Sequence, residues 1–284
     1  MKTVVSSAGN EVQISETMPT VLIGEKINPS GKKRLAEALQ SHDLDYVRQL
    51  AMAQAEAGAD ILDVNVAGPG LDEVALLPEV VTAIMDAVDI PLCLDFNDPA
   101  ALQGALNVYK GKPLINSVTG EEDSLREILP LVKEYNTAVI GLTIDDAGIP
   151  KDAGMRVDIA GKILERAESF DIPREDVIID CLALTLGSDT NTALMTLDAV
   201  RGIKETFGCN QTLGASNVSF GLPDRGVINR TFLAIAIAAG VTCPTVDAEK
   251  VRATIFTTDL ILGRDRFSQR YIKDYRRRQK EAER

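Results

Sequence analysis

Short apolar segments alternate with longer segments of helical periodicity along almost the whole chain. The apolar segments have the length and near-continuous hydrophobicity of strands buried on both faces, as the strands of a parallel sheet are. They predict eight strands, at residues 21–28, 59–65, 90–96, 113–118, 137–144, 177–182, 212–219 and 240–247. Each strand is followed by a helical pattern, at residues 33–57 with a break near Ser41, then 72–88, 98–109, 123–134, 155–170, 190–207, 228–239 and 248–262.

Strands that each precede a helix favour a closed (β/α)8 barrel, the TIM-barrel fold of the α/β class. An open, doubly wound sheet is the alternative arrangement of the same elements. The chain has 284 residues, close to the roughly 250 residues of a typical barrel. We therefore expect a single domain over residues 1–284, in which residues 1–18 form an N-terminal arm and residues 265–284 a basic C-terminal helix.

The composition excludes several classes of protein. Hydrophobic residues make up 45% and charged residues 25% of the chain, near the averages for folded globular proteins. No apolar segment reaches the roughly 18 residues that cross a bilayer, and residues 1–18 do not resemble a secretory signal. The net charge of −12 repels the phosphate backbone of nucleic acids. We expect a cytoplasmic protein that binds neither membranes nor nucleic acids.

Few residues offer nucleophilic or metal-binding chemistry. The one histidine, His42, falls in the break of the first helical region, which argues against His-dependent hydrolysis and His-ligated metals. Lys26 is a candidate for a Schiff base, although an ion pair with Glu25 or Asp63 is the commoner state of such a lysine. No P-loop or G-x-G-x-x-G motif follows a strand. The four cysteines form no C-x-x-C pair and are expected to be reduced core thiols: Cys93, Cys181, Cys209 and Cys243.

Polar side chains stand at the carboxyl ends of several predicted strands, where ligands bind in parallel α/β folds. The candidates are Asp63, Asn65, Asp95, Asn116, Asp180, Ser216 and Asn217, with Arg225 on the loop that follows. Carboxylates accept N–H donors and carboxamides both donate and accept, which suits the edge of a flat heterocycle such as a pterin. Taken alone, a strand-end Asp such as Asp63 is better explained as a cap of the following helix. The convergence of several strand ends favours a binding site.

A series of short motifs occurs in order along these strands, at residues 23–28, 62–65, 92–95, 115–117, 141–143, 148–152, 179–180, 216–219 and 228–232. In these motifs, over nearly the whole barrel, the chain resembles the methyltetrahydrofolate:corrinoid methyltransferases. That family of pterin-binding barrels is related to the folate module of cobalamin-dependent methionine synthase and, more distantly, to dihydropteroate synthase.

The resemblance implies that Asp95, Asn116 and Asp180 hold the pterin and that Asn217 is the catalytic contact to N5, which carries the methyl group. Phe220 departs from the stand-alone members, which can carry Gln there, and agrees with the methionine synthase module. The resemblance also implies a homodimer, for which the apolar helix at residues 228–239 offers a contact surface.

The implied activity moves a methyl group between N5 of tetrahydrofolate and the cobalt of a corrinoid, such as cobalamin, carried by a partner protein. Because cobalt supplies the nucleophile, the chain needs positioning and electrostatics rather than a nucleophile of its own. Carboxylates would favour positive charge at N5 and so assist departure of the amine. Two alternatives stay open. A dihydropteroate synthase would need an anion site, for which Lys26 and Arg225 are candidates, and a non-catalytic folate-binding subunit would need no catalytic contact.

Overall fold

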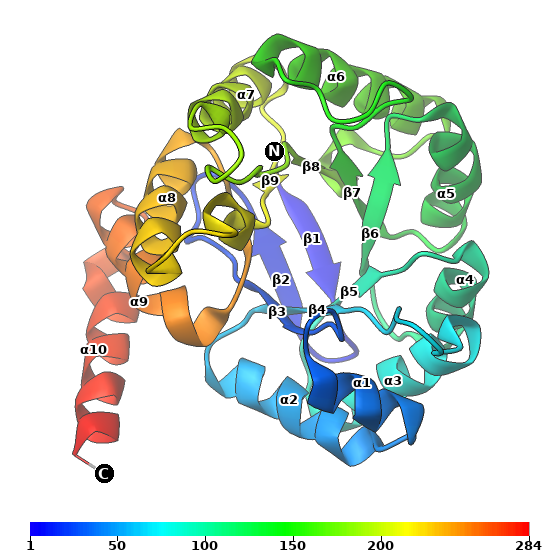
Figure 1. The fold of residues 1–284 in the computed structure, drawn as a ribbon, viewed down its shortest axis with the longest axis horizontal. Coiled ribbons are helices and arrows are strands. Elements are labelled where there is room, and N and C mark those ends of the chain that lie inside the picture. Colours follow the sequence, from blue (N-terminus) through cyan, green and yellow to red (C-terminus); the bar gives the residue numbers. More distant parts are fainter. Residues whose placement is uncertain (284) are drawn as a thin grey trace.

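Eight parallel strands form the centre of the fold, and helices surround them (Figure 1). The computed structural model describes residues 1–283. The strands are β3 (Ile23–Ile27), β4 (Ile61–Val64), β5 (Leu92–Asp95), β6 (Leu114–Thr119), β7 (Ala138–Leu142), β8 (Val177–Asp180), β9 (Gln211–Thr212) and β10 (Thr245–Val246). Neighbours in the sheet follow the chain order, and β10 pairs with β3.

The ends of this sheet meet and close the ring. The backbone N–H of Thr245 donates to the carbonyl of Leu213 at 3.0 Å, and that of Cys243 donates to Gln211 at 3.1 Å. An open sheet would leave both edges unpaired, so the closed (β/α)8 barrel expected from the sequence is confirmed.

The helices agree with the periodic segments of the sequence, including the break near Ser41, which separates α1 from α2. They are α1 (Lys33–Gln40), α2 (Leu44–Glu56), α3 (Glu73–Ala87), α4 (Pro99–Val108), α5 (Glu122–Glu134), α6 (Ala153–Ser169), α7 (Thr192–Phe207), α8 (Arg225–Ala239), α9 (Ala248–Ile261) and α10 (Gln269–Ala282). Three of the early ones begin at an aspartate, Asp43, Asp72 or Asp98, whose carboxylate accepts a backbone N–H of the first turn.

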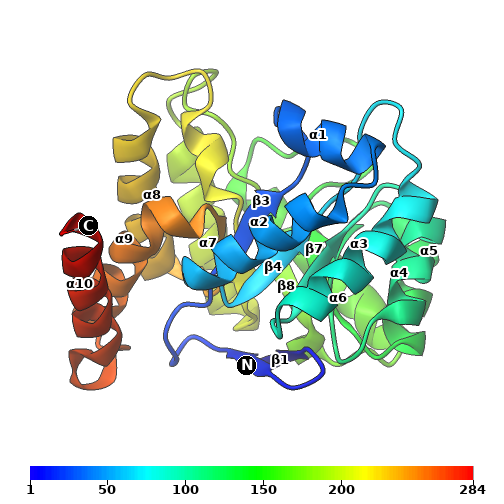
Figure 2. The same ribbon diagram turned by 90° about the horizontal axis from the view of Figure 1, so that it is seen from below.

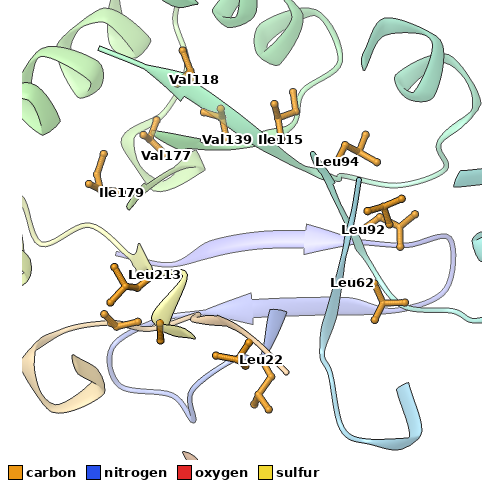
Figure 3. Packing of buried hydrophobic residues seen from close by; sticks show 14 of the residues in the cluster. Leu22, Leu62, Leu92, Leu94, Ile115, Val118, Val139, Val177, Ile179 and Leu213 are labelled. Atoms are coloured by element: carbon orange, nitrogen blue, oxygen red, sulfur yellow. The ribbon is translucent and has the colours of Figure 1, made fainter. Parts of the chain in front are cut away.

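Side chains along each strand alternate between two apolar clusters. One cluster fills the space between strands and helices and includes Leu22, Leu62, Leu92, Leu94, Ile115, Val139 and Ile179. Figure 3 shows these side chains around the ring of strands. The other cluster fills the barrel interior and includes Ile23, Ile61, Cys93, Leu114, Ile140, Ile178 and Cys243. This alternation decides which residues near the strand ends face inward.

The N-terminal arm is a β-hairpin of β1 (Thr3–Ser6) and β2 (Glu11–Ile14). It crosses the end of the barrel opposite to the loop that leads into α1 (Figure 2). Val5 and Ile14 are fully buried and join the interior cluster. The Asn210 side chain donates to both Thr3 Oγ1 and the carbonyl of Ile14, each at 2.9 Å. The hairpin therefore plugs the amino-terminal end of the barrel.

Two predicted strands are wrong over much of their length. Residues 212–219 were expected to form a strand, but β9 ends at Thr212 and Ala215–Ser219 form a 3₁₀ helix, η2. The backbone N–H of Asn217 donates to Gly214 at 3.2 Å, and that of Phe220 donates to Asn217 at 3.1 Å. Gly, Ser and Asn favour such tight turns over a strand ladder. The last strand, predicted at residues 240–247, is likewise reduced to β10.

The basic C-terminal segment forms the short η3 (Arg266–Ser268) and α10, which lies beside α9 at the edge of the fold (Figure 1). Asp274 on α10 is buried and pairs with Arg252 of α9 at 2.8 Å and with Arg278 at 2.9 Å. The expected basic helix is thus present, and a buried ion pair attaches it to the barrel.

Candidate functional site

Four predicted site residues form one layer inside the carboxyl end of the barrel. Each stands two positions after a side chain of the interior cluster, as Asp63 stands after Ile61 and Asp95 after Cys93. Because strand side chains alternate with a period of two, these residues face inward. The other two are Asn116, after Leu114, and Asp180, after Ile178.

Three of these side chains are direct neighbours. Asp95 and Asn116 are paired residues of β5 and β6. The Asn116 side chain donates from Nδ2 to Asp63 Oδ1 at 3.1 Å. Asp63 is only 4% exposed, and Asn65 beyond it is also buried. Asn65 accepts the backbone N–H of Ala67 at 2.8 Å, so one face of its amide is fixed by its own loop.

Asp180 connects the layer to the segment after β9. Its Oδ1 accepts the backbone N–H of Leu182 at 2.7 Å, and the backbone N–H of Gly214 also lies close enough to favour its ionised form. Leu182 has a positive φ of 61°, a conformation that non-glycine residues rarely adopt. The Asp180 carboxylate thereby holds the loop that leaves β8 and faces the start of η2.

Burial raises the pKa of every carboxyl group in this layer, because desolvation disfavours the charged form. The pKa of Asp63 rises from 3.8 to about 6, opposed mainly by the Asn116 hydrogen bond. The pKa of Asp95 rises from 3.8 to about 7, through burial and then the charge of Asp63, while Asn65 opposes the shift. Burial likewise raises the pKa of Asp180 to about 6. These groups exchange protons near neutral pH.

The segment with Ser216 and Asn217 lies at the rim of this layer. Asn217 is exposed on η2, and its side chain makes no hydrogen bond to any residue between 1 and 283. A side chain on Gly214 would lie 3.2 Å from the Asn217 amide nitrogen. The amide is therefore free to bind a ligand, and its close neighbour must stay small.

Arg225 braces η2. Its Nε donates to Ser219 Oγ and its Nη2 to the carbonyl of Ser216, both at 2.9 Å. Its guanidinium lies 5.7 Å from the ring centroid of Phe220, which is 67% exposed. Arg225 therefore fixes the loop that carries Ser216 and Asn217, and no carboxylate among residues 1–283 pairs with it.

Glu25 is a member of the site that the sequence interpretation missed. It stands two positions after the inward-facing Ile23, the same spacing that identifies the other members. The Ser216 hydroxyl donates to Glu25 Oε2 at 3.5 Å. Burial, followed by the charges of Asp247 and Asp63, raises the pKa of Glu25, while Lys32 opposes the shift.

Lys26 does not have the partners expected from the sequence. Its Nζ lies 2.6 Å from Glu249 and 3.3 Å from Asp247, rather than beside Glu25 or Asp63. Burial is the largest single influence and lowers the pKa of Lys26, but the contacts with Glu249 and Asp247 together outweigh it and raise the pKa. A Schiff-base lysine needs a lowered pKa, so the Lys26 environment disfavours that chemistry.

A cavity of about 600 Å³ adjoins the layer between η2, α8 and α9. Glu25 and Ser216 line it on the side of the layer, and Leu233, Val246 and Val251 form apolar parts of its wall. Its charged lining residues are Glu25, Asp247, Arg225, Arg230 and Lys250.

The sequence model of the family described as "Pterin binding enzyme" matches residues 24–247, a range that includes all eight strands of the barrel apart from Ile23, the first residue of β3, and ends just before α9. The chain belongs to the pterin binding enzyme family. The inward layer of carboxyl and carboxamide groups lies inside the matched region, and the hairpin and α10 lie outside it.

Two kinds of protein are similar in sequence to this pterin binding barrel. The Methylcorrinoid:tetrahydrofolate methyltransferase of Eubacterium limosum is 31% identical over 264 residues, which cover 90% of this chain and 96% of the relative. The Methionine synthase of Mycobacterium tuberculosis is 30% identical over 260 residues, or 87% of this chain. The chain spans only 22% of that larger protein.

The fold is shared with solved structures of lower sequence identity. Yersinia pestis DHPS with a pterine-sulfa conjugate has a TM-score of 0.70 at 16% identity, covering 92% of this chain and 98% of that one. Dihydropteroate synthase from Xanthomonas albilineans in complex with 7,8-dihydropteroate has a TM-score of 0.69 at 19% identity, covering 91% and 98%. At these identities the likeness concerns the fold alone.

Proposed function

We propose that this chain transfers a methyl group between N5 of tetrahydrofolate and the cobalt of a corrinoid such as cobalamin, carried by a partner protein. The observation that carries the proposal is the inward layer of Asp63, Asp95, Asn116 and Asp180 in a barrel that matches a methylcorrinoid:tetrahydrofolate methyltransferase over 96% of that relative. The name of that relative gives a methylcorrinoid and tetrahydrofolate as its substrates, and we propose both for this chain.

The layer is suited to the pterin edge of the folate. We assign Asp95, Asn116 and Asp180 to its amino, ring N–H and carbonyl groups, with Asp63 and Asn65 orienting them from the buried side. A carboxylate accepts two N–H donors and a carboxamide supplies both a donor and an acceptor. Ser216 and Arg225 support the rim, where Asn217 reaches N5.

The transfer requires no nucleophile from the protein. Towards the corrinoid, the electron pair of Co(I) attacks the methyl carbon, the carbon–N5 bond breaks, and N5 takes a proton, so that Co(III)–CH₃ and tetrahydrofolate result. In reverse, the N5 lone pair attacks the methyl group, Co(I) departs with the bonding pair, and N5 releases its proton. Asn217 can turn its oxygen toward a protonated N5 or its NH₂ group toward an unprotonated one. The chain thus positions the folate, keeps water from its N5 atom and supplies a hydrogen bond that can reverse its direction.

The test is direct assay of both directions. Purified protein is incubated with methyltetrahydrofolate and reduced cobalamin, and separately with methylcobalamin and tetrahydrofolate. Methylcobalamin formation in the first or consumption in the second, followed by absorbance, is the expected result. Asp180→Asn, which removes a carboxylate from the pterin layer, should lower this activity, and Asp86→Asn, an exposed substitution on α3, is its matched control. Failure of the folded protein in both directions, with free and protein-bound corrinoid, would reject the proposal.

The two alternatives predict different products. A dihydropteroate synthase would release pyrophosphate from a pterin pyrophosphate and p-aminobenzoate, which the same protein should not do. Of its two candidate cations, Lys26 is already paired with Asp247 and Glu249. A non-catalytic subunit would bind folate without transferring its methyl group.

The assembly and compartment follow as further proposals. We infer a homodimer, in which α8 contributes the exposed Val227 and Ile235 to the contact. A light-scattering mass of one chain at micromolar concentration would contradict it.

The four cysteines are buried free thiols, which suits a reducing cytoplasm. Among residues 1–283, no helix is both long and apolar enough to cross a membrane.

A further inference from the structure

The cavity between η2, α8 and α9 has a charge pattern that the pterin site does not use. Arg225, Arg230 and Lys250 stand against Glu25 and Asp247 in its lining, whereas the whole chain carries −12. Cations gathered beside a substrate site in an acidic protein indicate attraction of an anion.

The carboxylate of Asp247 is already neutralised. It pairs with Lys250 at 3.0 Å and with Lys26 at 3.3 Å. Arg230, by contrast, forms no ion pair with any carboxylate among residues 1–283, and neither does Arg225. A guanidinium presents several donors in a planar fork that matches a carboxylate. The unused charge of the cavity therefore comes from its arginines.

Asn229 adds an unused polar group. It lines the same cavity from the first turns of α8, and its Oδ1 is buried without a hydrogen-bond partner in the described part of the chain. A buried acceptor without a partner is destabilising, and a ligand N–H donor would remove that cost. Its neighbour Arg230 donates only, so the pair Asn229 and Arg230 together suits a group that has an amide N–H next to a carboxylate.

The position and the volume of the cavity also suit the part of the folate that extends beyond the pterin ring. Ser216 and Glu25 belong both to its wall and to the rim of the pterin layer. Its volume of about 600 Å³ falls in the range of about 300–1,000 Å³ for small-molecule sites. Its wall also includes Leu233, Val246 and Val251, which suit an aromatic ring.

We propose that this cavity binds the benzoyl-glutamate tail of the folate, with Arg230 receiving a glutamyl carboxylate and Asn229 the amide N–H beside it. The proposal rests on the proposed function, because it takes the folate as the substrate of the neighbouring layer. A tail with several γ-linked glutamates places further carboxylates near Arg225 and Lys250. The cavity then makes the chain selective for folates with longer tails.

The experiment compares three ligands by calorimetry: 6-methyltetrahydropterin, which lacks the tail, tetrahydrofolate with one glutamate, and tetrahydrofolate with three. We expect the Kd of the unaltered protein to fall in that order. Arg230→Gln should remove about 5- to 20-fold of the gain from the tail, as expected for a partly exposed charge-assisted contact, and should leave the Kd of the pterin unchanged. Arg230→Lys should restore part of the gain.

Arg276→Gln is the matched control, because Arg276 is an exposed arginine of α10 outside the cavity. It should show the same dependence on tail length as the unaltered protein. Equal Kd values for one and three glutamates in the unaltered protein would overturn the proposal, as would an unchanged gain in Arg230→Gln.

Two further outcomes separate this proposal from others. An acidic side chain of the corrinoid protein could supply the carboxylate instead. In that case Arg230→Gln would slow transfer to the protein-bound corrinoid, spare transfer to free cobalamin and leave all three Kd values unchanged, which would overturn the tail assignment. Failure of the proposed function appears differently, as absent methyl transfer with both corrinoid forms in protein that still shows the tail-length dependence.

Discussion

Asp63→Asn tests whether the ionised carboxyl groups of the layer lower the free energy of unfolding of the protein. Asp63 is 4% exposed, and burial raises its pKa from 3.8 to about 6. A raised pKa means that the folded protein binds the proton more tightly than the unfolded chain does. Its contribution to stability is therefore present below pH 4 and is lost as the pH rises through about 6. An asparagine keeps the shape and the acceptor for Asn116 but cannot ionise.

The magnitude follows from the shift. One pKa unit corresponds to about 1.4 kcal/mol, so the ionised Asp63 costs the folded protein about 3 kcal/mol at pH 8. Asp63→Asn should therefore increase the free energy of unfolding by up to about 3 kcal/mol at pH 8 and change it little at pH 4. Asp95 adds to the effect, because the negative charge of Asp63 contributes to the raised pKa of Asp95.

The assay is urea unfolding of the ligand-free protein at a series of pH values from 4 to 8, with Asp86→Asn as the exposed control. The difference between Asp63→Asn and the unaltered protein should grow with pH, and Asp86→Asn should show no such growth. Equal destabilisation by Asp63→Asn at both ends of the pH range would refute the reasoning.

Three further predictions concern binding and catalysis. Asn217→Ala should slow single-turnover methyl transfer by roughly 10² to 10³ with a smaller loss of folate affinity, and a near-normal rate in folded, folate-saturated protein would remove Asn217 from the N5 contact. Asp95→Ala and Asp180→Ala should each weaken folate binding by about 1–3 kcal/mol, measured by calorimetry, and unchanged affinity would end that assignment. Folate affinity should rise from pH 5 to pH 8, because Asp95 and Asp180, with pKa values of about 7 and about 6, must ionise to accept N–H donors, and a flat profile would argue against their role.

The barrel and most of its site could be predicted because a parallel barrel repeats one simple pattern. Strands such as β5 and β8 are continuously apolar and end in a carboxylate, so both their existence and their polar exits are visible in the sequence. The period of two then identifies which exit residues face inward. The same rule, applied to Ile23 and Glu25, would have found the member that was missed.

The segment with Asn217 could not be predicted in detail. Leu213 and Val218 are buried as strand residues would be, so hydrophobicity alone does not separate a strand from a 3₁₀ helix. Tertiary contacts decide the outcome, since Arg225 binds Ser216 and Ser219 from the next helix. The prediction that Asn217 lies at the rim agrees with its exposure, while the strand that was meant to place it there is absent.

The hairpin at the amino-terminal end of the barrel helps to keep water away from the carboxyl groups near its other end. The hairpin contributes Val5 and Ile14 to the interior cluster, which also contains Ile61 and Cys93, the residues two positions before Asp63 and Asp95. Burial is the largest cause of the raised pKa of both carboxyl groups, and a barrel open at its amino-terminal end would let water reach them from below. The hairpin lies outside the residues matched by the pterin binding family. We therefore expect the proton affinity of the site to depend on this hairpin, which lies at the opposite end of the barrel from the proposed substrate.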